Sequence, residues 1–194
     1  MKKIALLFTA SIFAAGLNAQ TKWNFDPAHT IIEFEVSHMV ITDVTGKFYS
    51  FEGEVTSDGE DFTDAKISFK IDASSINTEN ERRDGHLKGP EFFDVEKHPH
   101  ITFESNSMKK ISGNKYKLTG DFTMHGVTKE ITLNAIFNGI ADDPWGNTKA
   151  GFKVTGSVNR EEYGLTWNTT LDNGNLLVGT DVAIICRIQL VKAN

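Results

Sequence analysis

The sequence predicts an all-β protein, a closed barrel of about eight antiparallel strands. Apolar and polar residues alternate along most of the 194-residue chain, as they do in strands with one buried and one solvated face. Short turns that contain glycine separate the alternating segments and are typical of hairpins. The chain also has 14 Phe, whose large apolar side chains fill cores or line cavities. Such a barrel has room for one small ligand.

The segments that alternate most regularly are the expected strands. They lie at residues 32–36, 47–55, 65–71, 101–103, 116–124, 131–137, 152–158 and 182–190. One polar face per strand favours antiparallel pairing, because parallel strands are usually apolar on both faces. Gly53 predicts a bulge in the second strand. Gly120 and Gly156 fall on apolar faces, which predicts either a bend of the barrel wall or a group that closely approaches the backbone.

Two regions lack the alternating pattern. Residues 79–88 are highly charged and predict a short helix near one end of the barrel, with Asn77 or Thr78 as its cap. Residues 91–95 predict a further short turn after Pro90. Residues 160–178 predict an irregular segment. Segments of this kind at a barrel end commonly gate an interior cavity.

The first residues predict a secretory signal peptide at 1–19 and one domain at 20–194. Lys2 and Lys3 precede an apolar stretch, and Ala19 is a small residue at the expected cleavage position. The stretch has about ten residues, whereas a membrane-spanning helix needs about twenty. We therefore expect a periplasmic or secreted protein without stable membrane insertion. A net charge of −6 argues against nucleic acids and anionic membrane surfaces as partners.

The residues that could support chemistry form no recognised catalytic pattern. The single cysteine, Cys186, alternates with aliphatic residues, so we expect a buried thiol and no disulfide. His98 and His100 have a spacing that places both on one side of a strand, with His86 as the nearest third ligand, but Pro99 separates them and no metal site is expected. Nucleophile-elbow, phosphate-loop and dinucleotide motifs are missing, so we expect neither a cofactor nor an enzyme.

A charged cluster on the expected helix has two interpretations. Arg83, Asp84 and His86 could lie at the barrel mouth and bind a polar head group, since the planar guanidinium of arginine pairs well with phosphate. The same residues could instead form a salt bridge that fixes the helix to the barrel, for example with Asp26 or Glu91. The sequence leaves both interpretations open.

Several motifs together resemble those of the YceI-like family of bacterial polyisoprenoid-binding proteins. The resemblance covers residues 23–191 and rests on the following segments: Asp26-Pro27-Ala28-His29-Thr30, Phe34-Glu35-Val36-Ser37-His38, Gly46-Lys47-Phe48, Ser75-Ile76-Asn77-Thr78, Arg83-Asp84-Gly85-His86-Leu87, Phe92-Phe93-Asp94, Pro99-His100-Ile101-Thr102-Phe103, Gly120 to Gly126, and Asn159 to Gly164. It implies an extended eight-stranded, lipocalin-like barrel with a helix near one end. It also implies a hydrophobic tunnel for an isoprenoid or another long-chain amphiphile, and a homodimer.

We therefore expect a protein that binds an isoprenoid or fatty-acyl ligand inside its barrel. The candidate lining residues are Phe34, Val36, His38, Phe69, Phe103, Phe122, Met124, Phe137, Phe152 and Val154, some of which must instead plug the barrel. One alternative is an enzyme that acts on a small hydrophobic substrate through His29, His38, Asp84 or His86. Another is a stress-response partner protein with an incidental cavity.

Overall fold

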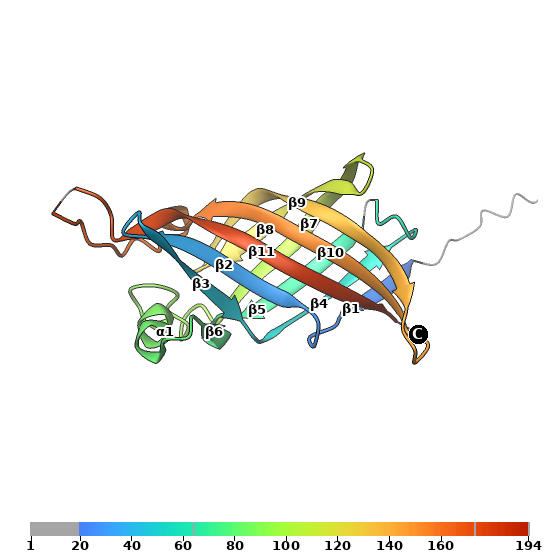
Figure 1. Cartoon of the computed structure of the whole chain (residues 1–194), viewed down its shortest axis with the longest axis horizontal. Helices are drawn as coiled ribbons and strands as arrows, with labels where there is room; N and C mark the ends of the chain where they lie inside the picture. The colour runs from blue at the N-terminus through green and yellow to red at the C-terminus, as the bar shows by residue number, and fades with distance from the viewer. Residues whose placement is uncertain (1–19, 64, 173, 194) are drawn as a thin grey trace, which may run out of the picture.

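A computed structural model of the chain describes residues 20–63, 65–172 and 174–193. The expected signal peptide lies outside the described residues. The described chain forms an elongated, closed antiparallel barrel of eight strands with one short α-helix near one end, which confirms the predicted fold class. Figure 1 shows the strands crossing the long axis of the barrel obliquely. None of the described helices is long and apolar enough to cross a membrane.

Most neighbouring strands around the barrel are consecutive in the chain, but the second and third strands pair beside the last one instead. Their bounds are β1 (Thr21–Phe25), β2 (Ile31–His38), β3 (Thr42–Phe48), β4 (Phe51–Ser57), β5 (Lys66–Asp72), β6 (Ile76–Asn77), β7 (His100–Ser112), β8 (Lys115–Met124), β9 (Val127–Asp142), β10 (Thr148–Asn159) and β11 (Val178–Lys192). Pairing of β1 with both β4 and β11 closes the barrel. Strand β2 continues along the same edge of β11, with β3 and β6 beyond it.

The N-terminal strands differ from the prediction in two ways. Residues 47–55 belong to two strands, β3 and β4, because the chain leaves the ladder at Tyr49 and Ser50. Gly53 forms no bulge, since β4 pairs with β5 in an unbroken register. Strand β1 was not predicted, because only Trp23 and Phe25 carry its apolar alternation. Trp23 is nevertheless 1% exposed and belongs to the core.

Helix α1 (Glu81–Lys88) lies close to the predicted position but has a different cap. The side chain of Asn80 accepts a hydrogen bond from the Arg83 amide at 3.0 Å. Asn77 instead accepts from the amide of Glu79 at 2.7 Å, which closes the turn before the helix. Residues 91–93 form the short turn predicted after Pro90. Figure 1 places α1 and β6 together beneath one end of the barrel.

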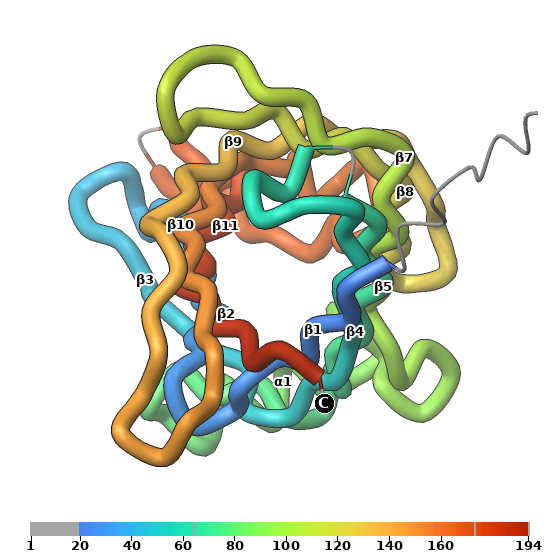
Figure 2. The backbone as a smooth tube through the Cα atoms, turned by 90° about the vertical axis from the view of Figure 1, so that its right-hand side faces the viewer, coloured from blue at the N-terminus to red at the C-terminus, as the bar shows by residue number. Residues whose placement is uncertain are grey.

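The opposite end of the barrel, which holds the C-terminus, is filled by aromatic side chains. Phe62, in the loop between β4 and β5, lies 5.2 Å from Trp23, 5.4 Å from Phe137 and 4.9 Å from Phe152 between ring centroids. The Tyr116 hydroxyl donates a hydrogen bond to the Asp61 carbonyl at 2.5 Å and holds this loop in place. Figure 2 views the barrel from this end, with the loop lying across part of it. Because Phe62 and Trp23 are each 1% exposed, this end is closed to water.

Candidate functional site

The barrel encloses a narrow apolar cavity of about 210 Å³. Its wall extends from Val55 and Phe62 at the closed end to Leu165 and Val178 at the other. The interior side chains come from strands on every side of the barrel, because alternation turns every second residue inward. Charged residues contribute little to this wall, which makes the cavity suitable for a slender apolar molecule.

The structure places most of the predicted lining residues on this wall. They are Phe34, Val36, Phe69, Phe103, Phe122, Met124, Phe152 and Val154. Phe137 lies outside the cavity: its ring stacks on Phe152 at 5.0 Å and contacts Phe62, so it contributes to the aromatic closure. His38, at the end of β2, lines a second cavity at the barrel mouth. Cys186 is buried on the inner wall as expected, and burial raises the pKa of its thiol to about 12.

Two glycines in the wall leave space for aromatic rings to lie flat against the backbone. A Cβ atom at Gly46 would come within 2.3 Å of the Phe34 ring, and one at Gly120 would come within 2.6 Å of the Phe103 ring. Both distances are far shorter than a van der Waals contact. Of the two interpretations of Gly120, the structure supports a group that closely approaches the backbone, and this group is the Phe103 ring. The rings cover the wall instead of filling the centre of the barrel.

A wider cavity of about 710 Å³ adjoins the barrel interior at the mouth. Helix α1, the end of β2 and the segment before β11 surround it. It shares lining residues with the barrel cavity and adds polar side chains that the inner cavity lacks: Ser37, His38, Asn80, Arg82, Arg83 and His86. The interior thus changes from apolar to polar toward the mouth, as a site for an amphiphile requires.

The charged cluster on α1 contacts Thr78 through Arg83 and Asp84, and of the two predicted partners it contacts Glu91, through His86, but not Asp26. Arg83 donates from Nε to the Thr78 hydroxyl at 2.7 Å and from a terminal nitrogen to the Thr78 carbonyl at 2.8 Å. Asp84 accepts hydrogen bonds from the amide and the hydroxyl of the same threonine. Glu91 pairs with His86 at 2.9 Å. Arg83 and Asp84 are therefore occupied by local contacts.

Asp26, the other predicted partner, lies in a polar network close to the closed end. Its carboxylate is 2.9 Å from His29 Nδ1, 2.8 Å from Gln189 Nε2 and 3.2 Å from Lys149 Nζ. Although burial by itself raises the pKa of a carboxyl group, the hydrogen bonds from His29, Gln189 and Lys149 hold the pKa of Asp26 well below its ordinary value. The network joins the β1–β2 connection to β10 and β11 and has a structural role.

Arg160 is a residue whose role the sequence did not reveal. It is 3% exposed and lies on the cavity wall near the mouth. Its guanidinium donates hydrogen bonds to the backbone carbonyls of Gly179, Leu165, Trp167 and Val178. Burial lowers its pKa. These bonds fix the irregular segment 160–178 against the start of β11 and so shape one side of the mouth.

The three histidines considered as possible metal ligands, His86, His98 and His100, do not come together, in line with the expectation from Pro99. His100 begins β7 on an exposed position opposite Asp72. His98 lies in the preceding turn, with its ring 4.6 Å from that of His125, and His86 packs against Phe92 and Trp167. The pattern of residues at i and i+2 applies only if both residues belong to the strand, and β7 begins after Pro99.

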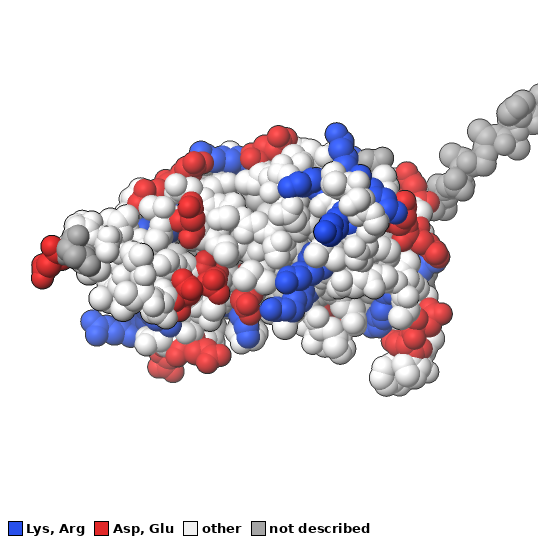
Figure 3. Space-filling view, turned by 45° about the horizontal axis from the view of Figure 1, so that its top comes forward, with Lys and Arg blue, Asp and Glu red and all other residues white. Residues whose placement is uncertain are grey.

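The outer surface of the barrel is charged and contrasts with the interior. In Figure 3, Lys and Arg side chains gather on one half of the visible face, and Asp and Glu side chains are spread toward both ends. Polar residues of each strand point outward in this arrangement, as the alternation in the sequence predicted.

Comparison with known proteins identifies the family. The chain matches the model of the YceI-like domain over residues 23–190. It belongs to the YceI-like family. A UPF0312 protein of Staphylococcus aureus is 40% identical over 163 residues, which are 84% of this chain and 92% of the relative.

Solved YceI-like structures have the same fold. The YCEI protein of Campylobacter jejuni is 29% identical, with a TM-score of 0.69 over 81% of this chain and 90% of the other. A domain from Saccharophagus degradans, described as polyisoprenoid binding and implicated in plant cell wall breakdown, is 14% identical, with a TM-score of 0.67 over 88% of this chain and 98% of the other. At this low identity, the second likeness concerns the fold alone.

Proposed function

We propose that this YceI-like protein binds one long apolar chain, an isoprenoid or a fatty-acyl amphiphile, inside its barrel. The observation that carries the proposal is the narrow apolar cavity that adjoins a polar mouth. The name of the S. degradans domain, polyisoprenoid binding, supports the same class of ligand. In this proposal the protein is a carrier or store of the ligand and not an enzyme.

Burial of an apolar chain provides enough free energy for binding. Each Å² removed from water contributes about 25 cal/mol, so a chain that buries roughly 400 Å² gains about 10 kcal/mol. Association costs about 4–15 kcal/mol, depending on how much freedom is lost. At the low end of that cost about 6 kcal/mol remains, which corresponds to a Kd of roughly tens of micromolar, and head-group contacts would tighten binding further.

The mouth is the proposed site of the ligand's polar head group. Arg82 is exposed and His86 is partly exposed, and both line the mouth cavity. Arg83 also lines it, although two of its guanidinium nitrogens already bond to Thr78. We therefore assign head-group contact first to Arg82, and a positioning role to Arg83, Asp84 and His86, whose Nε2 is paired with Glu91.

The proposed location is the periplasm or the outside of the cell, because residues 1–19 have the pattern of a signal peptide. Fractionation of cells that express the whole chain tests this proposal, and a shortened product in the periplasmic or extracellular fraction supports it. Full-length chain in the cytoplasm contradicts it. The expected homodimer stays a prediction, for which sedimentation velocity is the direct measurement.

The deciding experiment is native mass spectrometry of gently purified protein, followed by lipid extraction. We expect one bound long-chain molecule per barrel. An apo mass, without uptake of added polyprenyl or fatty-acyl probes, would contradict the proposal and direct attention to the histidines.

A matched pair of variants locates the ligand. Val154→Trp places a large side chain on the cavity wall, and Lys153→Trp places the same side chain on the exposed face of the same strand. We expect the first variant to lose at least about tenfold in ligand occupancy and the second to match the wild-type protein. Equal occupancy in the two folded variants would show that the chain does not bind in the barrel.

A further inference from the structure

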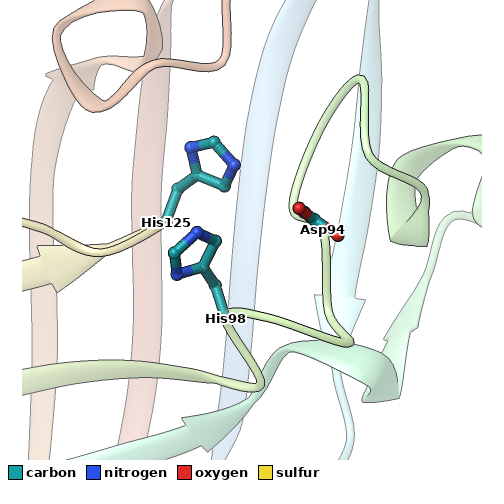
Figure 4. Close-up of side chains that lie close together, drawn as sticks. All are labelled: Asp94, His98 and His125. Carbon is teal, nitrogen blue, oxygen red and sulfur yellow. The ribbon is translucent and has the colours of Figure 1, made fainter.

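Three side chains with metal-binding chemistry converge outside the barrel cavity. Asp94, His98 and His125 offer one ligand atom each, and these atoms all lie within 4.8 Å of one another. Figure 4 shows Asp94 and His98 coming from the segment before β7 and His125 from the turn between β8 and β9, with the three side chains gathered in one place. All three side chains are partly buried.

The ring of His125 is already oriented by a backbone group. Its Nδ1 lies 3.1 Å from the carbonyl oxygen of Tyr163. A carbonyl oxygen only accepts hydrogen bonds, so Nδ1 carries the proton in this contact. In the neutral ring Nε2 then has a free lone pair, and this is the form of histidine that ligates a metal. A hydrogen bond from the second ring nitrogen to a carbonyl is the usual support of a metal-bound histidine.

The backbone brings Asp94 and His98 to the same side of their turn. The carbonyl of Asp94 accepts hydrogen bonds from the amides of Lys97 and His98, at 2.9 and 2.8 Å. These bonds form one turn of helical type, in which residues four apart share a side. Asp94 and His125 both have positive φ angles, 45° and 50°, which are uncommon for residues other than glycine. The fold thus holds both residues in conformations of higher energy.

Glycines provide the space in which the two imidazole rings pack. A Cβ atom at Gly126 would lie 2.8 Å from Cε1 of His98, and one at Gly164 would lie 3.1 Å from Nδ1 of His125. Each ring therefore rests directly on backbone, and a side chain at either glycine would displace it. The rings meet nearly edge to face, at an interplanar angle of 65°.

The carboxylate of Asp94 already forms an ion pair with Lys97, which would compete weakly with a metal ion. Lys97 Nζ is 2.8 Å from Oδ2, but the side chain of Lys97 is 73% exposed and that of Asp94 is 14% exposed. Ion pairs with one solvent-exposed partner contribute about 0–1 kcal/mol. The contact with Lys97 therefore costs little to give up, and a carboxylate oxygen of Asp94 is available to a metal ion.

We propose that Asp94, His98 and His125 bind a divalent transition-metal ion, of which Zn²⁺ fits best. Two imidazole nitrogens and one carboxylate oxygen are a donor set that Zn²⁺ prefers, with Zn–N and Zn–O distances of about 2.0–2.2 Å. Ligand atoms around a tetrahedral ion at those distances are about 3.3–3.5 Å apart, so small side-chain rotations bring the group together. Water or an external ligand occupies the remaining coordination position.

The bound ion would join three parts of the structure. Asp94 and His98 belong to the connection between α1 and β7, His125 belongs to the β8–β9 turn, and Tyr163 ends the short 3-10 helix before the mouth segment. The metal site is therefore separate from the ligand cavity and connects the segment after α1 to the barrel rim. Metal binding should stabilise the folded protein, because the unfolded chain does not hold these ligands together.

The test titrates Co²⁺ and then Zn²⁺ into the purified chain without a polyhistidine tag. We expect one Co²⁺ per chain, seen as visible d–d absorption that Zn²⁺ abolishes, and a higher melting temperature with Zn²⁺. His98→Gln, His125→Gln and Asp94→Asn should each weaken metal binding at least about tenfold. The control His100→Gln, two residues from His98 on an exposed position, should bind as the wild-type protein does.

Two results would overturn the proposal. One is the lack of stoichiometric binding by the wild-type chain, and the other is unchanged binding by the three variants. If a variant does not fold, histidine ring resonances of the wild-type protein decide the question. Zn²⁺ should shift the ring nitrogen signals of His98 and His125 and leave those of His100 and His29 in place, and any other pattern contradicts the assignment.

Discussion

Asp26 shows at the scale of one residue how the chain stabilises a partly buried carboxylate. His29, Gln189 and Lys149 surround it, and these partners come from the β1–β2 connection, β11 and β10. They lower its pKa from the ordinary value of 3.8. A carboxyl group with a lowered pKa in the folded state contributes stability above its unfolded pKa and loses it as the pH falls toward the folded value.

Asp26→Asn should destabilise the protein by about 2 kcal/mol at pH 7, because charged hydrogen bonds contribute about 1.5–3 kcal/mol each and are not additive. The difference from the wild-type protein should shrink below pH 3.8, where the unfolded wild-type chain binds the proton. Urea unfolding at neutral and acidic pH measures both effects. Asp43→Asn, at an exposed position, is the control and should change stability by less than about 0.5 kcal/mol. An equal loss at every pH would contradict this role of the charge.

At the scale of the element, Gly46 in β3 leaves the space that the Phe34 ring of the neighbouring strand β2 occupies. The register places Phe34 directly opposite Gly46, and the ring lies where a larger residue would have its Cβ atom. The atoms nearest to that position belong to the side chains of Phe34 and Thr78 and not to the backbone. A methyl group there can be accommodated only if the Phe34 ring turns toward the cavity.

We therefore expect Gly46→Ala to narrow the cavity while the protein keeps its fold. Binding of a polyprenyl probe should fall by about tenfold, and overpacking should cost about 1–3 kcal/mol of stability. Probe titration and circular dichroism measure these two effects. Gly151→Ala is the matched control, because its nearest neighbour, Asn138 Cβ, would be at an ordinary contact distance of 3.5 Å. Full binding by Gly46→Ala would show that the ring does not limit the cavity.

Alternation in the sequence identified the long strands but not the contacts between distant elements. Strands β8 to β11 carry enough apolar positions for the period of two to be unmistakable, whereas β1 carries too few. The inward direction of Phe137 follows from the pattern, but its height along the barrel axis does not, so its place among the aromatic rings of the closed end was missed. His125 lies in a turn without a local ligand motif, and the antiparallel pairing of β7 with β8 places it beside His98.

The whole molecule is a barrel with two unlike ends. One end is closed by the rings of Trp23, Phe62, Phe137 and Phe152. The other end adjoins the wide mouth beside α1 and the segment that Arg160 holds in place. The apolar cavity therefore has a fixed depth, set by the position of Phe62.

Phe62→Ala should deepen the cavity and shift the preferred ligand to longer chains. Removing a buried phenyl group costs about 3–5 kcal/mol, so the measurement belongs at low temperature in a folded sample. Native mass spectrometry with a series of fatty acids compares the chain length of highest occupancy in the variant and the wild-type protein. Tyr49→Ala removes an aromatic ring that is 64% exposed and serves as the control. An unchanged length preference would show that Phe62 does not mark the end of the ligand site.

The aromatic closure of one end also determines the orientation in which the proposed ligand enters and leaves the barrel. Because the barrel is closed at one end, the tail of the ligand must enter through the mouth first. The ligand can leave only through the same mouth, with the tail leaving last. A receiving membrane or protein therefore meets the head group before any of the tail, and has to engage it while the tail is still inside. Exchange between donor and acceptor then proceeds one molecule at a time, through the mouth.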